Sequence, residues 1–324
     1  MYLFDELKEK LNGKKIPIVF PEGEDIRVLS ACVKLNQESY IHPIVLGNDE
    51  IITELADDNN LNIDNLEIIN PKKYSQINEM AEALFARRKG KLEQEKALEL
   101  CLNNPNYFGT MLVYLDKAKG LVSGAVGSTA DTVRPGLQII KMKPGYKLVS
   151  GAFLMLHDED RKLFSDCAIN INPNAEELSE IAKCSSITAK EFGIEPRIAM
   201  LSFSSMGSAK SPEQEKVATA TKIAKEKYPE LILDGELQFD AALVESIGHK
   251  KAPNSKVAGC ANTFIFPNLD AGNIGYKIAE RLGKYEAIGP ILQGMAKPVN
   301  DLSRGCNSDD VYKLALITAI QSLD

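Results

Sequence analysis

The chain has 324 residues, of which 44% are hydrophobic and 26% charged, values that are typical of a soluble globular protein. The length predicts two domains rather than a single core. A net charge of −7 without a long basic run argues against a nucleic-acid-binding protein. No apolar run approaches the roughly 20 residues that span a bilayer, so we expect no membrane partner.

Cysteine and histidine usage argues against a metal centre. The three histidines are widely spread, and the cysteines form no CxxC pair and no zinc spacing. Without a signal peptide, the cysteines are interpreted as reduced thiols of a cytoplasmic protein. The six cysteines are Cys32, Cys101, Cys167, Cys184, Cys260 and Cys306.

The N-terminal part alternates helices and strands. An amphipathic helix is expected over residues 2–12, ended by Gly13, and strands are expected near residues 15–20, 42–47 and 66–70 with helices between them. This alternation predicts an open parallel sheet covered by helices on both faces. Ligands of such sheets bind beyond the carboxyl ends of the strands, where the PEGED turn at residues 21–25 would lie.

Residues 75–116 have a helical pattern that includes the densest basic cluster of the chain: Arg87, Arg88, Lys89 and Lys91. Cations favour a helix C-terminus, so a solvated helix end is one interpretation. A phosphate site is the other, because arginine suits bidentate contacts to phosphate. The residues alone favour the first.

Residues 120–140 predict a strand, a small-residue loop and a helix. The loop contains Gly127, Ser128 and Thr129, and Arg134 follows in the helix. Glycines, hydroxyls and free backbone N–H groups at a helix start form an anion site. The segment matches neither a P-loop nor a GxGxxG fingerprint, so the pattern is nonspecific.

The second half has the same α/β character beyond a candidate domain crossing around Pro144. Strands are expected within residues 148–156, 163–170, 197–204 and 257–267, and helices over 174–192, 212–227 and 271–283. The last of these helices carries Arg281 in its final turn.

The stretch at residues 294–310 has the most suggestive order of side chains. Pro298 stops any preceding helix, and the segment to Gly305 is expected to be a polar loop before a final helix over residues 311–323. Asn307, Ser308 or Asp309 could cap that helix.

Ser303 and Arg304 lie in this loop, and Asp310 falls near the first helical turn. A carboxylate base and a cation facing developing negative charge could serve one reacting centre. The alternative is an N-cap with a surface Asp–Arg pair, which contributes little to stability. If the last helix returns to the first domain, the loop would span the crossing and lie in an interdomain cleft.

Several motifs together resemble the phosphate acetyl/butyryl transferase family over the whole chain. Their number, order and spacing carry the resemblance. The most specific part is KPVNDLSRGC together with DGELQFDAA. The motifs are PEGED, RRKGK at 87–91, STADTVRPGLQII ending at Ile140, SDCAIN at 165–170, SFSSMGSAKS at 202–211, DGELQFDAA, FPNLDAGNIGYKIAERL and GPILQG followed by KPVNDLSRGC.

The resemblance implies an isocitrate-dehydrogenase-like fold of two three-layer α/β/α domains with a cleft between them. Residues 1–144 with 298–324 would form the first domain and residues 145–297 the second. It also implies a homodimeric phosphate acetyltransferase that transfers an acetyl group reversibly between acetyl phosphate and coenzyme A. Coenzyme A, acetyl-CoA, acetyl phosphate and phosphate would bind as substrates, with no tightly bound cofactor or metal.

The resemblance also implies roles for single residues. Ser303 and Arg304 would be the catalytic pair, and Asp310 the base that takes the proton from the coenzyme A thiol, which then attacks acetyl phosphate directly in a ternary complex. The substrate-binding residues would be Arg87 (or Arg88, one register on), Arg134, Arg281, Ser128 and Thr129. Family members often carry a histidine where this chain has Gly127, so no role of that histidine can be transferred.

Four alternatives stay open on the sequence. A phosphate butyryltransferase would differ only in its acyl pocket, where one methylene changes binding by roughly 1–3 kcal/mol. An isocitrate-dehydrogenase-like oxidoreductase would share the fold, but the chain has no nucleotide fingerprint or metal carboxylate cluster. A catalytically silent binding module is the third. An acetyl-enzyme intermediate on Cys167 or Cys306 is the fourth, a change of mechanism.

Overall fold

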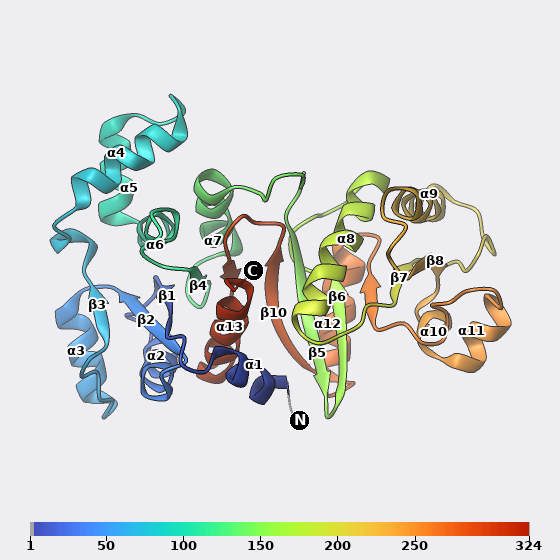
Figure 1. Ribbon diagram of the computed structural model, residues 1–324, viewed down its shortest axis with the longest axis horizontal. Coiled ribbons are helices and arrows are strands. Elements are labelled where there is room, and N and C mark those ends of the chain that lie inside the picture. The colour runs from blue at the N-terminus through green and yellow to red at the C-terminus, as the bar shows by residue number, and fades with distance from the viewer. Residues whose placement is uncertain (1–2, 324) are drawn as a thin grey trace. The chain divides into compact units, whose positions relative to one another are not determined.

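A computed structural model describes residues 3–323 of the chain, which form two compact units (Figure 1). Within the described residues, unit 1 comprises 3–143 and 295–323, and unit 2 comprises 144–294. Each unit contains one sheet with helices packed against it. The predicted α/β fold class is therefore confirmed.

Unit 1 contains a five-stranded parallel sheet, as the alternation of helices and strands predicted. Its strands follow the order β11-β4-β1-β2-β3, so β1 is the middle strand and lies between β4 and β2. The strands are β1 (Ile16–Phe20), β2 (Ile41–Leu46), β3 (Glu67–Ile69), β4 (Gly120–Ser123) and β11 (Val299–Asp301).

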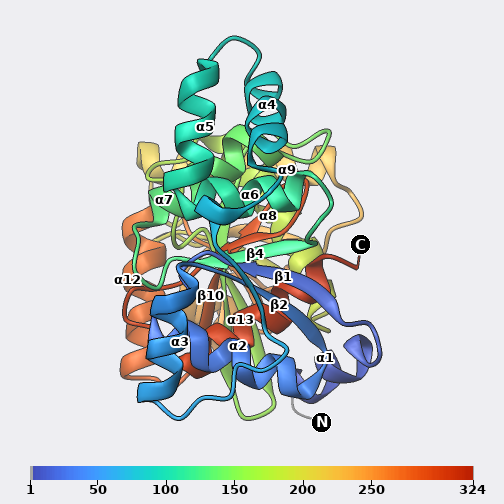
Figure 2. The same ribbon diagram turned by 90° about the vertical axis from the view of Figure 1, so that its left-hand side faces the viewer.

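Helices cover both faces of this sheet. Figure 2 shows α6 and α7 on one face and α2 and α13 on the other. Of these helices, α6 and α13 contact β1 and β4, α2 contacts β2, and α7 contacts β11. The helices are α1 (Leu3–Leu11), α2 (Ile26–Glu38), α3 (Asp49–Asp58), α4 (Ile77–Arg88), α5 (Gln94–Asn103), α6 (Pro105–Tyr114), α7 (Thr129–Pro135) and α13 (Ser308–Gln321), with a 3₁₀ turn at Pro71–Lys73 and a π-helix at Gly136–Ile140.

Local sequence explains where the helices of unit 1 begin and what they bury. Leu3, Leu7 and Leu11 are four residues apart on α1 and are all buried, as predicted; Tyr2, where the expected helix began, lies outside the described residues. Asp25 caps α2 by accepting a hydrogen bond from the backbone N–H of Arg27.

Unit 2 contains a six-stranded mixed sheet in the order β10-β5-β6-β9-β7-β8. The pairs β10–β5 and β5–β6 are antiparallel and the other pairs are parallel. The strands are β5 (Ser150–His157), β6 (Asp160–Ser165), β7 (Ile198–Leu201), β8 (Leu233–Leu237), β9 (Thr263–Ile265) and β10 (Glu286–Gln293). The helices are α8 (Ala175–Glu191), α9 (Pro212–Lys227), α10 (Phe239–Leu243), α11 (Glu245–Lys251) and α12 (Leu269–Arg281).

One expected loop contains a strand. The segment from Pro298 to Gly305 was predicted to be a polar loop, but Val299–Asp301 form β11, which pairs with β4. The polar side chain of Asn300 is tolerated in the interior because its Nδ2 donates hydrogen bonds to Thr318 Oγ1 at 2.9 Å and Gln321 Oε1 at 2.7 Å. Polar composition therefore misidentified a strand whose Asn300 amide is satisfied by α13.

Two further strand predictions need correction. The strand expected within residues 257–267 is limited to the three residues of β9, and β10 was not predicted. The helix expected to run to Ile140 changes to a π-helix after Pro135, because proline lacks the N–H that a regular α-helix would use.

Candidate active site

Three segments leave the carboxyl edge of the unit 1 sheet at neighbouring strands. Residues 21–25 follow β1, residues 124–128 follow β4 and residues 302–306 follow β11, and these strands are adjacent in the sheet. In an open parallel sheet, this edge is the usual place for a ligand site. The PEGED turn therefore lies at the edge where it was predicted.

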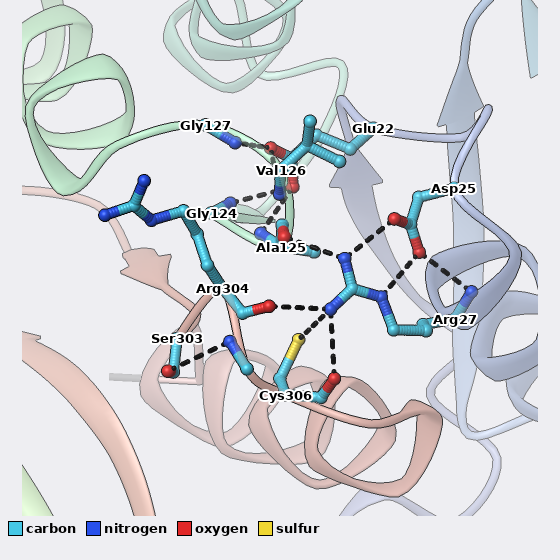
Figure 3. Close-up of polar contacts among 11 residues, drawn as sticks. Glu22, Asp25, Arg27, Gly124, Ala125, Val126, Gly127, Ser303, Arg304 and Cys306 are labelled. Carbon is cyan, nitrogen blue, oxygen red and sulfur yellow. Dashed lines mark hydrogen bonds and ion pairs between the residues drawn. The ribbon is translucent and has the colours of Figure 1, made fainter.

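The carboxylate of Glu22 fixes the loop after β4. It accepts hydrogen bonds from four successive backbone N–H groups, Gly124 (2.8 Å), Ala125 (2.7 Å), Val126 (3.1 Å) and Gly127 (2.9 Å) (Figure 3). A run of N–H groups is the kind of nest that binds anions, and here the protein's own carboxylate fills it. The expectation of free N–H groups in this loop is therefore wrong for residues 124–127.

The start of α7 is also internally bonded. Asp131 Oδ2 accepts hydrogen bonds from the backbone N–H of Ser128 at 2.9 Å and from its hydroxyl at 2.7 Å. Both Ser128 and Thr129 are exposed at the beginning of the helix. Their proposed contact with a substrate stays a prediction.

Arg27 joins all three segments. Its Nη1 donates to the carbonyls of Arg304 at 2.8 Å and Cys306 at 3.1 Å, and its Nη2 donates to the carbonyl of Ala125 at 2.8 Å (Figure 3). Asp25 accepts from Nε at 2.9 Å and from Nη2 at 2.8 Å, and these bonds with Arg27 lower the pKa of the Asp25 carboxyl. Sequence reasoning gave Arg27 no role, although it lies two residues after the PEGED turn.

Ser303 and Arg304 are exposed on the segment that Arg27 anchors. Ser303 Oγ accepts a hydrogen bond from the Gly305 N–H at 3.3 Å. The Arg304 guanidinium points away from Arg27 in Figure 3 and has no hydrogen-bond or ion-pair partner among residues 3–323. The backbone of the segment is thus fixed, whereas a hydroxyl and a cation are presented outward.

Asp310 occupies the third position of α13 and closes a capping box. Its Oδ2 accepts from the Asn307 N–H at 2.8 Å, and Asn307 Oδ1 accepts from the Asp310 N–H at 3.0 Å. Asn307 is thus the cap among the three candidates. The capping interpretation accounts for one carboxylate oxygen of Asp310, and the base role proposed for this residue stays a prediction.

The basic cluster of α4 has two kinds of contact. Arg87 donates from Nε to the Ile139 carbonyl at 2.6 Å and lies over the Tyr114 ring, 4.9 Å from its centre, so this side chain holds α4 to the π-helical segment. Burial raises the pKa of Tyr107, whereas nearby Arg88 and Arg134 lower it. The two arginines therefore approach the same phenol, from α4 and α7.

Arg281 belongs to unit 2. It is the last residue of α12, its side chain is 78% exposed, and its closest acidic partner is the adjacent Glu280 at 3.5 Å. Its expected contact with a substrate phosphate stays a prediction.

The chain matches the family model described as phosphate acetyl/butaryl transferase over residues 2–319. It belongs to the phosphate acetyl/butyryl transferase family. A phosphate acetyltransferase from Bacillus subtilis is 58% identical over 321 residues, which cover 99% of each chain. The crystal structure of a phosphotransacetylase from Streptococcus pyogenes is 54% identical, with a TM-score of 0.95 and coverage of 99% of this chain and 98% of that one.

A more distant structure extends the fold comparison beyond the family. The 4-hydroxythreonine-4-phosphate dehydrogenase from Klebsiella pneumoniae has 11% identity and a TM-score of 0.55, with coverage of 96% of this chain and 99% of that one. At this identity the likeness concerns the fold alone. Membership in the phosphate acetyl/butyryl transferase family makes the chain an acyltransferase, as the motifs indicated.

An acyltransferase could use a cysteine as its nucleophile, and Cys167 and Cys306 are the two candidates in this chain. The burial of both side chains argues against this role. It raises the pKa of Cys306 to about 11, with Arg27 opposing the shift, and raises that of the fully buried Cys167 well above its ordinary value. The thiolate is the reactive form of cysteine, so burial disfavours either side chain as a nucleophile.

The backbone does not require glycine at position 127, where the resemblance led us to expect histidine. A Cβ at this position would lie 3.5 Å from Asp131 Cβ and from Glu22 Oε1, which is ordinary contact distance. A β-carbon therefore fits at this position without displacing Asp131 or Glu22.

A pocket of about 760 Å³ lies beside the segments of the site, at the carboxyl ends of β1, β2 and β3. Four carboxylates and one lysine line it: Glu22, Glu24, Asp25, Asp131 and Lys72. This excess of negative charge disfavours a polyanion there. Among the described residues, no helix is long and apolar enough to cross a bilayer, and no group of three or more His, Cys, Asp or Glu side chains could hold a metal ion.

Proposed function

We propose that the protein is a phosphate acetyltransferase that converts acetyl-CoA and phosphate to coenzyme A and acetyl phosphate, reversibly. The observation that carries the proposal is the presentation of Ser303 and Arg304 on a segment whose carbonyls Arg27 anchors, seven and six residues before Asp310. The printed names of relatives at 54–58% identity support the same reaction.

The proposed mechanism starts from the coenzyme A thiol. A thiol of pKa near 8.5 is mostly protonated at neutral pH, so Asp310 takes its proton in the direction that consumes acetyl phosphate. The thiolate attacks the acetyl carbon, a C–S bond forms, and the C–O bond to phosphate breaks as phosphate departs. Arg304 offsets the negative charge on the carbonyl oxygen and the leaving phosphate, and Ser303 orients the thiol.

Both substrates are polyanions, and the arginines supply contacts for their phosphates. Arg88 and Arg134 approach one phenol, and Lys141 adds a cation whose pKa is lowered first by Arg87 and also by the other cations of the α4 end. We propose Arg87 or Arg88, Arg134 and Arg281 as phosphate contacts, with Ser128 and Thr129 as neutral ones. Coenzyme A acts as a substrate, and the proposed chemistry requires neither a redox cofactor nor a metal.

Thiol release tests the reaction directly. Purified protein incubated with acetyl-CoA and phosphate is expected to release free thiol at a kcat in the range of about 1–10³ per second, and omission of phosphate is the control. Faster release from butyryl-CoA would overturn the acetyl preference and favour a phosphate butyryltransferase. Reduction of a nicotinamide cofactor without thiol release would favour the oxidoreductase alternative.

We also propose that the protein is a cytoplasmic homodimer, and α12 of unit 2 offers a surface for the second copy. Ile274, Ile278 and Leu282 are four residues apart and are exposed by 56%, 53% and 80%, so they form one apolar stripe. We expect Ile278→Glu to halve the mass measured by sedimentation equilibrium, because a buried unpaired charge opposes association. Ile232→Glu, at another exposed apolar position of unit 2, is the control, and an unchanged dimer in both variants contradicts this surface.

A further inference from the structure

Asp301 is a buried carboxyl at the junction of the two motifs that carry the proposed site. It ends β11, two residues before Ser303, and its partner on β4 is Ser123. Only 1% of Asp301 is exposed. A carboxyl at such a depth normally has a partner, because burying an unpaired charge is costly.

Several buried polar atoms around Asp301 have no hydrogen-bond partner among the described residues. Neither of its carboxylate oxygens has a hydrogen-bond partner of good geometry within residues 3–323, and the buried hydroxyls of Ser123 and Thr132 have none either. The backbone of Gly124 passes so close that a Cβ there would come within 2.3 Å of Asp301 Oδ1. Unsatisfied polar atoms gathered at one point are rare in native interiors and call for a functional explanation.

The two charged groups with the largest effect on Asp301 are both negative, and the nearby hydroxyl donors come from α7. Burial raises the pKa of Asp301 to about 6, and the charges of Glu22 and Asp131 raise it further. The nearby hydroxyls of Thr129 and Thr132 lower it, although neither forms a well-directed hydrogen bond with the carboxylate. The ionised carboxylate can accept hydrogen bonds from both threonines, whereas protonation removes part of this capacity. A change of pH around 6 therefore changes the charge of Asp301 and, with it, its contacts with the first turn of α7.

We propose that Asp301 is a positioning residue whose ionised carboxylate draws the first turn of α7, with Ser128 and Thr129, toward the strand that leads to Ser303 and Arg304. This inference rests on the proposed function, in which Ser128 and Thr129 contact a phosphate group. Protonation of Asp301 releases the turn and weakens phosphate binding. The chemical step, which depends on Asp310 and Arg304, is left nearly unchanged.

The test is the KM for inorganic phosphate between pH 5 and pH 8, measured with acetyl-CoA in the wild type and in Asp301→Asn. Because protonation disables the positioning, the wild-type KM should rise as pH falls, by up to about tenfold per unit below pH 6. Asparagine cannot ionise, so the variant should keep a high KM that varies little beyond the titration of phosphate itself, with kcat within about threefold of the wild type. Asp57→Asn, an exposed carboxylate of α3, is the control and should follow the wild-type profile.

A second variant covers the case in which Asp301→Asn does not fold. The Thr132 hydroxyl lowers the pKa of Asp301, so Thr132→Val should move the rise in KM to higher pH. The proposal is overturned if Asp301→Asn keeps the wild-type dependence of KM on pH, or if it loses kcat alone. If Asp301→Asn does not fold, the same dependence retained in Thr132→Val overturns the proposal. Absence of turnover in the wild type would instead overturn the proposed function. In that case, the dissociation constant of phosphate is measured by calorimetry over the same pH range. A pH dependence in the wild type that is absent from Asp301→Asn supports the positioning role, and the same dependence in both contradicts it.

Discussion

Replacing Arg304 with alanine is expected to lower kcat/KM by about 10²–10³, which corresponds to roughly 2.7–4 kcal/mol of transition-state stabilisation. The structure makes this an informative substitution because Arg27 bonds to the backbone carbonyl of Arg304 and not to its side chain. Alanine therefore keeps the anchor of the segment and removes only the outward guanidinium. Steady-state kinetics of thiol release, with both substrates varied, measure the effect.

Two comparisons separate the chemistry of Arg304 from its charge. Arg304→Lys keeps the cation but loses the planar fork, so we expect it to recover part of the activity lost in the alanine variant. Lys222→Ala, at an exposed position of α9 in unit 2, removes a cation elsewhere and should leave kcat/KM within about twofold. Wild-type kinetics in Arg304→Ala would remove this residue from the proposed mechanism.

Local sequence signals predicted the parts of unit 1 that depend on periodicity and capping. The leucines of α1, the parallel sheet and a polar N-cap before α13 all follow from patterns within about ten residues. The cap illustrates the limit of such reasoning, because Asn307, Ser308 and Asp309 are all good caps. Only the geometry shows that Asn307 accepts from the N–H groups of Asp309 and Asp310.

The contacts that organise the site connect segments far apart in the chain, and sequence patterns carry little information about them. Arg27 and Arg304 are 277 residues apart, and Glu22 is more than 100 residues from the loop whose N–H groups it accepts. The same limitation explains the missed strand β11. Its polar residues resemble a loop until the backbone pairing with β4 and the hydrogen bond from Asn300 to Thr318 of α13 are known.

The fixed carboxylates also change how the predicted anion site is understood. A helix start with glycines and hydroxyls suggested free N–H groups, but Glu22 and Asp131 already accept from residues 124–128. The loop is thus preorganised by negative side chains. We therefore expect a substrate phosphate to depend more on cations such as Arg134 than on the backbone nest.

Asp310→Asn is expected to lower kcat by about 10²–10⁴ in the direction that consumes acetyl phosphate, because asparagine cannot take the proton of the coenzyme A thiol. The substitution preserves the local structure, since the amide oxygen of asparagine can still accept from the Asn307 N–H. The KM values should change little, because the carboxylate acts on the proton and not on substrate phosphates.

Asp309→Asn is the matched control, because it removes a carboxylate from the same helical turn. Asp309 pairs with Lys313 at 2.5 Å, and its loss should cost a similar interaction with the helix dipole, about 0.3–1 kcal/mol, without loss of kcat. An equal fall of kcat in both variants would mean that the charge at the start of α13 matters and that Asp310 is not the base. A loss confined to Asp310→Asn, together with a KM effect confined to Asp301→Asn, would assign proton transfer to one carboxylate and positioning of α7 to the other.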